Sequence, residues 1–135
     1  MTKKILSLVL AACALFSIMS VPVYAKNTYF RFRLADKQSH SSSWGKATKD
    51  DGDIYAYITP HRGIDDFVSK GAVVNMRVRD RFENYATEYI ECRTYKKYTP
   101  RYLNGKAVAG DDYLLFANVE STNGYPVRMG GLWCP

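Results

Sequence analysis

Short runs in which apolar and polar residues alternate dominate the chain after residue 25. The clearest, Tyr29 to Leu34 (YFRFRL), places Phe30, Phe32 and Leu34 on one face, as in a strand that buries one side. Further runs cover residues 54–58, 72–80, 86–95, 112–120 and 125–134. No window sustains a helical period. Six to eight short strands therefore predict an all-β fold, a small antiparallel β-sandwich of immunoglobulin-like or jelly-roll-like type.

Turn signals separate these runs. Asn104-Gly105 and Asn123-Gly124 indicate hairpins, because a type I′ turn needs positive φ at both central positions. The acidic stretch Asp50 to Asp53 predicts another turn. Pro60 is expected to end the run at 54–58, since proline cannot continue a central ladder. Only the stretch from His61 to Lys70 has helical spacing, so we expect one helical turn there.

The first 25 residues have the plan of a secretory signal. A positively charged start and an apolar run from Ile5 to Met19 lead to the small-residue site Val23-Tyr24-Ala25. We therefore predict a signal peptide over 1–25 and a single secreted, extracellular domain over 26–135. The alternative is a lipid anchor at Cys13, because Leu10-Ala11-Ala12-Cys13 has the form of a lipobox.

Cleavage after Ala25 would remove Cys13 and leave 110 of the 135 residues with two cysteines, Cys92 and Cys134. An even number of cysteines in an oxidising compartment predicts a disulfide. The bond would close a loop of 43 residues, for which the chain-entropy model gives about 4 kcal/mol of stability. It would also clamp the last strand. A free thiol and a metal site are the alternatives.

Charge and aromatic content indicate a surface that binds anions. Without Lys3 and Lys4, 17 of the 19 Lys and Arg residues remain against 13 Asp and Glu, a net charge of +4. For an exported domain this favours an anionic cell-wall polymer or membrane surface over nucleic acid, for which no reader motif is present. Cations beside aromatic rings suit phosphates and sugars. The candidate binding residues are Arg77, Arg79, Arg81, Tyr95, Lys96, Lys97, Tyr98, Arg101 and Tyr102.

Arg31 and Arg33 share the outward face of another strand. The alternative for all these residues is structural, because Tyr and Arg also pack well across exposed sheet faces. The oligomeric state is left open.

Motifs for catalysis or metal binding are scarce. His40 and His61 lie in segments that resemble loops, and no recognised nucleophile or phosphate-binding glycine motif accompanies them. We therefore expect a protein that binds rather than catalyses, without cofactor or metal. A small secreted hydrolase or hydrolase inhibitor using the loops around His40 and His61 is the alternative. Calcium at Asp50, Asp51 and Asp53 is a further hypothesis, although a polar turn explains the same cluster.

The end of the chain, YLLFANVESTNGYPVRMGGLWCP from Tyr113, resembles a class of small secreted Gram-positive β-sandwich proteins of uncharacterised function. The matching residues of the closing strand are Tyr125, Val127 and Trp133, with Gly130 and Gly131 near the expected glycine, while the spacing and the terminal cysteine depart from the pattern. Some members are similar to lactococcin 972-type bacteriocins in size and export signal. The resemblance implies a bacteriocin-like or wall-associated role at a bacterial cell envelope, and it assigns no functional residue.

Overall fold

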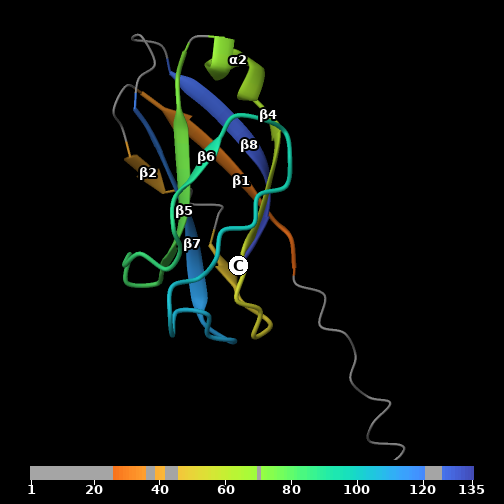
Figure 1. Cartoon of the computed structure of the whole chain (residues 1–135), viewed down its shortest axis with the longest axis vertical. Helices are drawn as coiled ribbons and strands as arrows, with labels where there is room; N and C mark the ends of the chain where they lie inside the picture. Colours follow the sequence, from red (N-terminus) through yellow and green to blue (C-terminus); the bar gives the residue numbers. More distant parts are fainter. Residues whose placement is uncertain (1–25, 36–38, 42–45, 70, 121–125) are drawn as a thin grey trace, which may run out of the picture.

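The computed structural model describes residues 26–35, 39–41, 46–69, 71–120 and 126–135. The predicted signal peptide over 1–25, Cys13 and the turn at Asn123-Gly124 lie outside these ranges. Within the described ranges, eight strands and one short helix make up the regular structure, and the strands form two antiparallel sheets (Figure 1). The all-β prediction is confirmed.

The first sheet has three strands, in the order β1 (Thr28–Leu34), β8 (Val127–Cys134) and β4 (Tyr57–Arg62). The last strand of the chain therefore lies at the centre of this sheet. It pairs with β1 along its whole length, from Trp133 opposite Thr28 to Val127 opposite Leu34.

The second sheet has the order β2 (Ser39–Ser41), β7 (Asp112–Val119), β5 (Val74–Asp80) and β6 (Ile90–Cys92), and β3 (Ala47–Thr48) also pairs with β7. The one helix of the described residues, α2 (Ile64–Ser69), connects β4 to β5. It lies where the sequence predicted a helical turn.

Both sheets contribute alternate side chains to one core, as strands that bury one face do. Phe32, Ile58 and Trp133 from the first sheet are fully buried, as are Met76 and Leu115 from the second. The residues between them point to the outer face of each sheet.

The connection between β7 and β8 differs from the prediction. The sequence indicated a hairpin, but β7 pairs with β2, β3 and β5, whereas β8 pairs with β1 and β4. The chain therefore crosses from one sheet to the other. At Asn104-Gly105 a turn forms, with Gly105 at a φ of 72° and a hydrogen bond of 2.9 Å from the amide of Lys106 to the carbonyl of Leu103. The predicted hairpin is wrong there, because Asn104 does not have a positive φ and the turn lies between β6 and β7, which do not pair with each other.

The strand β4 continues beyond Pro60, contrary to expectation. It is an edge strand, where proline is tolerated because one side of its backbone needs no ladder partner. The register against β8 shifts between Pro60 and Arg62, so that a bulge at His61 brings Arg62 opposite Gly130. The shift places Arg62 on the outer face of the sheet.

The structure does not contain the predicted disulfide, because Cys92 and Cys134 are both free and buried. They belong to different sheets and have different neighbours. Sγ of Cys92 lies 3.3 Å from Sδ of Met76, and Sγ of Cys134 lies 3.6 Å from the carbonyl oxygen of Pro135. The last strand, β8, is held by hydrogen bonding to β1 on one side and β4 on the other, and not by a disulfide.

Within the described ranges, no helix has the length and apolar character needed to cross a bilayer.

Candidate functional site

Four arginines lie on the outer face of the β1-β8-β4 sheet. Arg33 on β1 is directly opposite Arg128 on β8. In the next row, Gly130 on β8 lies between Arg31 on β1 and Arg62 on β4. We call this surface the arginine groove, which consists of Arg31, Arg33, Arg62 and Arg128 around Gly130.

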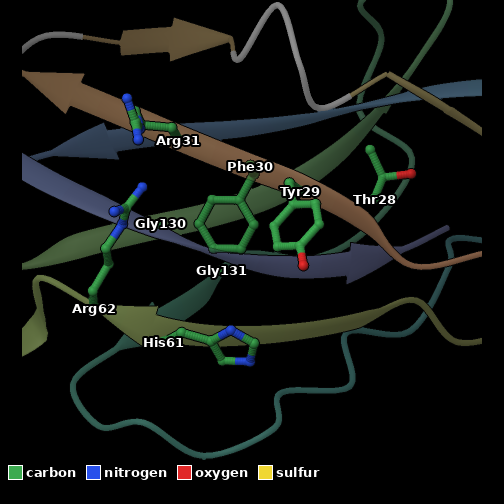
Figure 2. Close-up of a pocket in the computed structure, with 8 residues that line it drawn as sticks. All are labelled: Thr28, Tyr29, Phe30, Arg31, His61, Arg62, Gly130 and Gly131. Carbon is green, nitrogen blue, oxygen red and sulfur yellow. The ribbon is translucent and has the colours of Figure 1, made fainter.

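Glycine at position 130 forms the floor of the groove. A Cβ atom there would lie 2.9 Å from Nε of Arg62 and 3.1 Å from the carbonyl oxygen of Phe30. The side chain of Arg62 therefore occupies space that any larger residue would take. Figure 2 shows Arg62 extending from β4 towards β8 near the ring of Phe30, with His61 on the same strand.

Two cavities meet in the arginine groove. One, of about 770 Å³, is lined by Tyr29, Phe30 and His61 together with Arg31 and Arg62. The other, of about 620 Å³, shares Arg31 and Arg62 and adds the remaining two arginines of the groove. Tyr29 is 74% exposed, so its ring offers a flat surface on which a sugar can stack.

The groove is strongly cationic. Like charges directly opposite each other on neighbouring strands repel, and Arg33 and Arg128 occupy such positions. Within the described part of the chain, no hydrogen bond or ion pair engages any of the four guanidinium groups. Asp66 lines the smaller cavity, so one carboxylate accompanies four positive charges. Guanidinium groups in this situation can take oxyanions as bidentate ligands.

Two predicted binding residues, Arg77 and Arg79, lie on the outer face of the other sheet among aromatic rings. Cζ of Arg77 lies 3.1 Å from the ring centroid of Tyr89 and 3.8 Å from that of Tyr85. Cζ of Arg79 lies 3.4 Å from the ring centroid of Phe116 and 5.2 Å from that of Tyr85. We call these five residues the arginine–aromatic ladder.

The remaining predicted binding residues do not form one surface. Arg81 follows the end of β5, with Cζ 4.7 Å from the ring centroid of Phe82. Tyr98 and Tyr102 are buried in the core, and burial raises the pKa of the Tyr102 hydroxyl. Tyr98 is held there by two backbone hydrogen bonds with Ile58, of 2.8 and 2.9 Å. These two tyrosines therefore stabilise the fold.

Their neighbours lie on the surface but contact different parts of the fold. The hydroxyl of Tyr95 donates to Asp65 on α2 at 3.2 Å. Nζ of Lys97 lies 4.1 Å from the ring centroid of Tyr57. The other two predicted cations of this segment are Lys96, 5.1 Å from the ring centroid of Tyr98, and Arg101, which is exposed and forms a β-bridge with Tyr55.

The two histidines are on strands rather than in loops. His61 is exposed on β4 and lines the larger cavity of the groove. His40 is on β2 opposite Ala117, and its side chain lies outside what the structure describes.

The acidic turn uses its carboxylates internally. Asp51 accepts hydrogen bonds from the Lys49 ammonium and the Asp53 amide, each at 3.0 Å, and Asp53 accepts one from the Tyr57 hydroxyl. Across the described residues, no group of three or more His, Cys, Asp or Glu side chains is arranged to hold a metal ion.

Sequence reasoning missed Arg62, Arg128 and Gly130. The alternation of β1 did place Arg31 and Arg33 outward, but the other arginines come from segments 31 and 97 residues further along the chain than Arg31. Only the pairing of β1 and β4 with β8 brings them together.

In comparisons with known proteins, no family model, no curated protein and no solved structure matches this chain.

Proposed function

We propose that this chain is an exported, non-enzymatic binding protein that holds anionic polymers of a bacterial cell envelope, in a bacteriocin-like or wall-associated role. The observation that carries the proposal is the arginine groove, in which four guanidinium groups on three strands surround Gly130. On this proposal the two sheets form a β-sandwich, and the groove is on one of its outer faces.

The spacing of the groove favours a polymer over a single small anion. The two arginine rows are two residues apart along β8, and a strand advances roughly 6.6–6.8 Å over two residues. A linear chain that carries one anionic group per unit can therefore place successive charges against successive rows. The exposed ring of Tyr29 adds a surface for a sugar or polyol beside the charges.

The charge arrangement also favours binding on energetic grounds. Folding places Arg33 and Arg128 opposite each other, in a cavity lined by four arginines and one carboxylate, Asp66, and the repulsion between them disfavours the free protein. A bound polyanion relieves it. The paired strands fix the backbone positions of the four arginines, while ordering each long side chain on binding costs about 0.5–1.5 kcal/mol.

The test is retention of the purified protein on bacterial cell walls across a salt series. We expect binding at low salt that weakens as salt is added, since screening reduces contacts between exposed charges. Arg62→Gln should weaken binding about fivefold, following the contribution of one cation near an anionic surface. Arg93→Gln removes the same charge from an exposed residue that already pairs with Glu91, and it should change little.

Absence of binding at low salt would refute the proposal. Equal losses in the Arg62 and Arg93 variants would show that net charge, and not the groove, controls binding.

A second candidate, a hydrolase or hydrolase inhibitor using the segments around His40 and His61, has one observation in its favour, since His61 lines the larger cavity of the groove. Its test is activity against wall polymers before and after His61→Ala. An activity that survives this change and the same change at His40 would remove the only candidate bases.

A further inference from the structure

Arg77 occupies an unusual position for a charged residue. It is on the outer face of a sheet, yet it is 9% exposed, because the rings of Tyr85 and Tyr89 both lie close to its guanidinium group. A charge removed from water to this extent is costly unless it is paired and hydrogen-bonded.

No such pair is present among the described residues. Nε of Arg77 and Nε of Arg79 are buried and have no hydrogen-bond partner, and neither residue takes part in an ion pair. Cation–π contacts offset part of the cost of burial. They do not satisfy N–H donors, which require acceptors in the plane of the guanidinium group.

The nearby carboxylates are already engaged elsewhere. Glu91 on β6 is opposite Asn75 on β5, but its carboxylate forms an ion pair with Arg93 at 2.9 Å. Glu120 accepts a hydrogen bond of 2.8 Å from the side chain of Asn75. Neither of these two carboxylates is therefore paired with Arg77.

The terminal nitrogens of both arginines have no hydrogen-bond partner among the described residues, yet only the Nε atoms are fully buried without one. The terminal nitrogens therefore keep some contact with solvent. The neighbouring rings restrict the orientation of each guanidinium group. A fork held in one orientation is prepared for a bidentate oxyanion and loses little entropy when it binds one.

We propose that the arginine–aromatic ladder is a second oxyanion site, which binds two successive phosphate groups of a phosphodiester-linked polyol or sugar chain. Arg77 and Arg79 are two residues apart on β5, so their backbone positions repeat at roughly 6.6–6.8 Å along the strand. Each fork would take one phosphate. Tyr85 and Tyr89 are 53% and 43% exposed, and their free ring surfaces would contact the polyol or sugar units between the phosphates.

The inference takes its ligand class from the proposed function, but it does not depend on the arginine groove, which is on the other sheet. An acidic peptide also offers oxyanions. The phosphodiester chain is favoured because exposed aromatic rings alternate with the forks, an arrangement that matches alternating phosphates and polyol units.

The test is NMR of the protein labelled with ¹⁵N-arginine, titrated with a short glycerol phosphate oligomer. We expect the side-chain resonances of Arg77 and Arg79 to shift together and to saturate, while those of Arg93 stay in place. Inorganic phosphate should produce the same shifts with weaker affinity, because it can occupy one fork at a time. An oligomer of glutamate with the same number of charges serves as the peptide competitor.

Two variants test whether Arg77 binds the oligomer through the bidentate geometry of its guanidinium group or only through its positive charge. Arg77→Lys retains the charge and loses the bidentate geometry, so it should weaken oligomer binding roughly tenfold. Arg93→Lys is the matched control and should bind like the parent protein. Arg79→Lys provides the same comparison if the first variant does not fold, and thermal unfolding verifies the fold of each.

The outcomes distinguish this site from the groove. Shifts at Arg77 and Arg79 that persist in Arg62→Gln support a separate site, even if wall binding through the groove fails. The inference is overturned if the oligomer leaves these resonances unchanged, if Arg77→Lys binds as tightly as the parent, or if the glutamate oligomer binds better than the phosphate chain.

Discussion

The ammonium group of Lys49 donates a hydrogen bond of 3.0 Å to Asp51, and Lys49 itself is fully buried. Its Nζ also lies 4.9 Å from the ring centroid of Tyr102. Asp51 is the only described acid with which Lys49 forms an ion pair. Hydrogen bonds from Lys49 and the Asp53 amide lower the pKa of Asp51, although burial, the largest single influence, acts to raise it.

Removing the acid should therefore cost more than removing the base. Asp51→Ala leaves a buried ammonium without its counter-charge, and we expect a loss of about 3 kcal/mol in the free energy of unfolding. Lys49→Met retains most of the buried chain without the charge and should cost under about 1 kcal/mol. Urea unfolding of both variants measures the difference. An equal cost for both would mean that packing, and not the charge pair, determines stability there.

Arg33 and Arg128 allow a prediction that links stability to binding. Neutralising Arg128 removes a repulsion across two neighbouring strands, so Arg128→Gln should stabilise the free protein by a few tenths to about 1 kcal/mol at low salt. Added salt screens the repulsion and should shrink this gain. The same variant should bind cell walls more weakly.

The measurement is urea unfolding at low and high salt, with Arg93→Gln as the control. Arg93 pairs with Glu91, so neutralising it should not stabilise the protein. A destabilised Arg128→Gln at low salt would show that the repulsion is already balanced by interactions within the fold.

The strands themselves could be predicted because their signal is local. Alternation with period two depends only on neighbouring residues, and it placed β1, β5 and β7 within two residues of their observed bounds. The inward faces of these strands were also correct, as the burial of Phe30, Phe32 and Val78 shows.

Pairing between strands could not be predicted in the same way. The Asn123-Gly124 signal favoured a hairpin between β7 and β8, but β8 pairs with β1 and β4. Which neighbours a strand takes depends on how all apolar faces are buried together, and no local pattern carries that information. The arginine groove was therefore missed although Arg31 and Arg33 were recognised. The burial of Lys49 was missed for the same reason, since its position beside the acidic turn is typical of an exposed residue.

Gly131 is required by the close approach of β4 to β8. A Cβ atom at this position would lie 2.2 Å from the carbonyl oxygen of Thr59 and 2.7 Å from Cα of Pro60. Both are backbone atoms of the neighbouring strand, so they cannot move aside without disturbing the pairing. Gly131→Ala should therefore lower the free energy of unfolding by about 3 kcal/mol or more.

Gly52→Ala is the matched control, because a Cβ atom there meets nothing within 4 Å, and we expect a change within about 0.5 kcal/mol. Thermal unfolding of the two variants is sufficient. A Gly131 variant as stable as the Gly52 variant would show that β4 can shift away from β8 at little cost.

The raised pKa of the Tyr57 hydroxyl predicts a loss of stability at alkaline pH. A hydrogen bond to Asp53, with help from burial and from the charges of Asp53 and Asp51, raises the pKa of the Tyr57 hydroxyl from 10.0 to about 12. Folding favours the protonated phenol, so its contribution is fully present below pH 10 and is lost as pH rises from 10 to 12.

The stability difference between the parent and Asp53→Asn should follow this window. It should be constant up to about pH 10 and then shrink, because the asparagine variant lacks the charge that holds the proton on the phenol. Titration of ¹³C-labelled tyrosine by NMR gives the pKa of Tyr57 directly, with Tyr57→Phe identifying the resonance. A Tyr57 resonance that titrates near pH 10 in the parent would contradict the prediction.

Because Cys92 and Cys134 are buried, we expect both to react slowly with thiol reagents in the folded protein. Burial raises the pKa of Cys92 to about 12 and also raises that of Cys134, and the thiolate is the reactive form. We expect neither thiol to be alkylated by iodoacetamide at neutral pH until denaturant is added, after which both should react. Peptide mapping by mass spectrometry locates each label and separates these sites from Cys13. Two sites that remain unlabelled in denaturant but react after reduction would show that the protein forms the Cys92–Cys134 disulfide, and that the free thiols of the structure do not persist in an oxidising compartment.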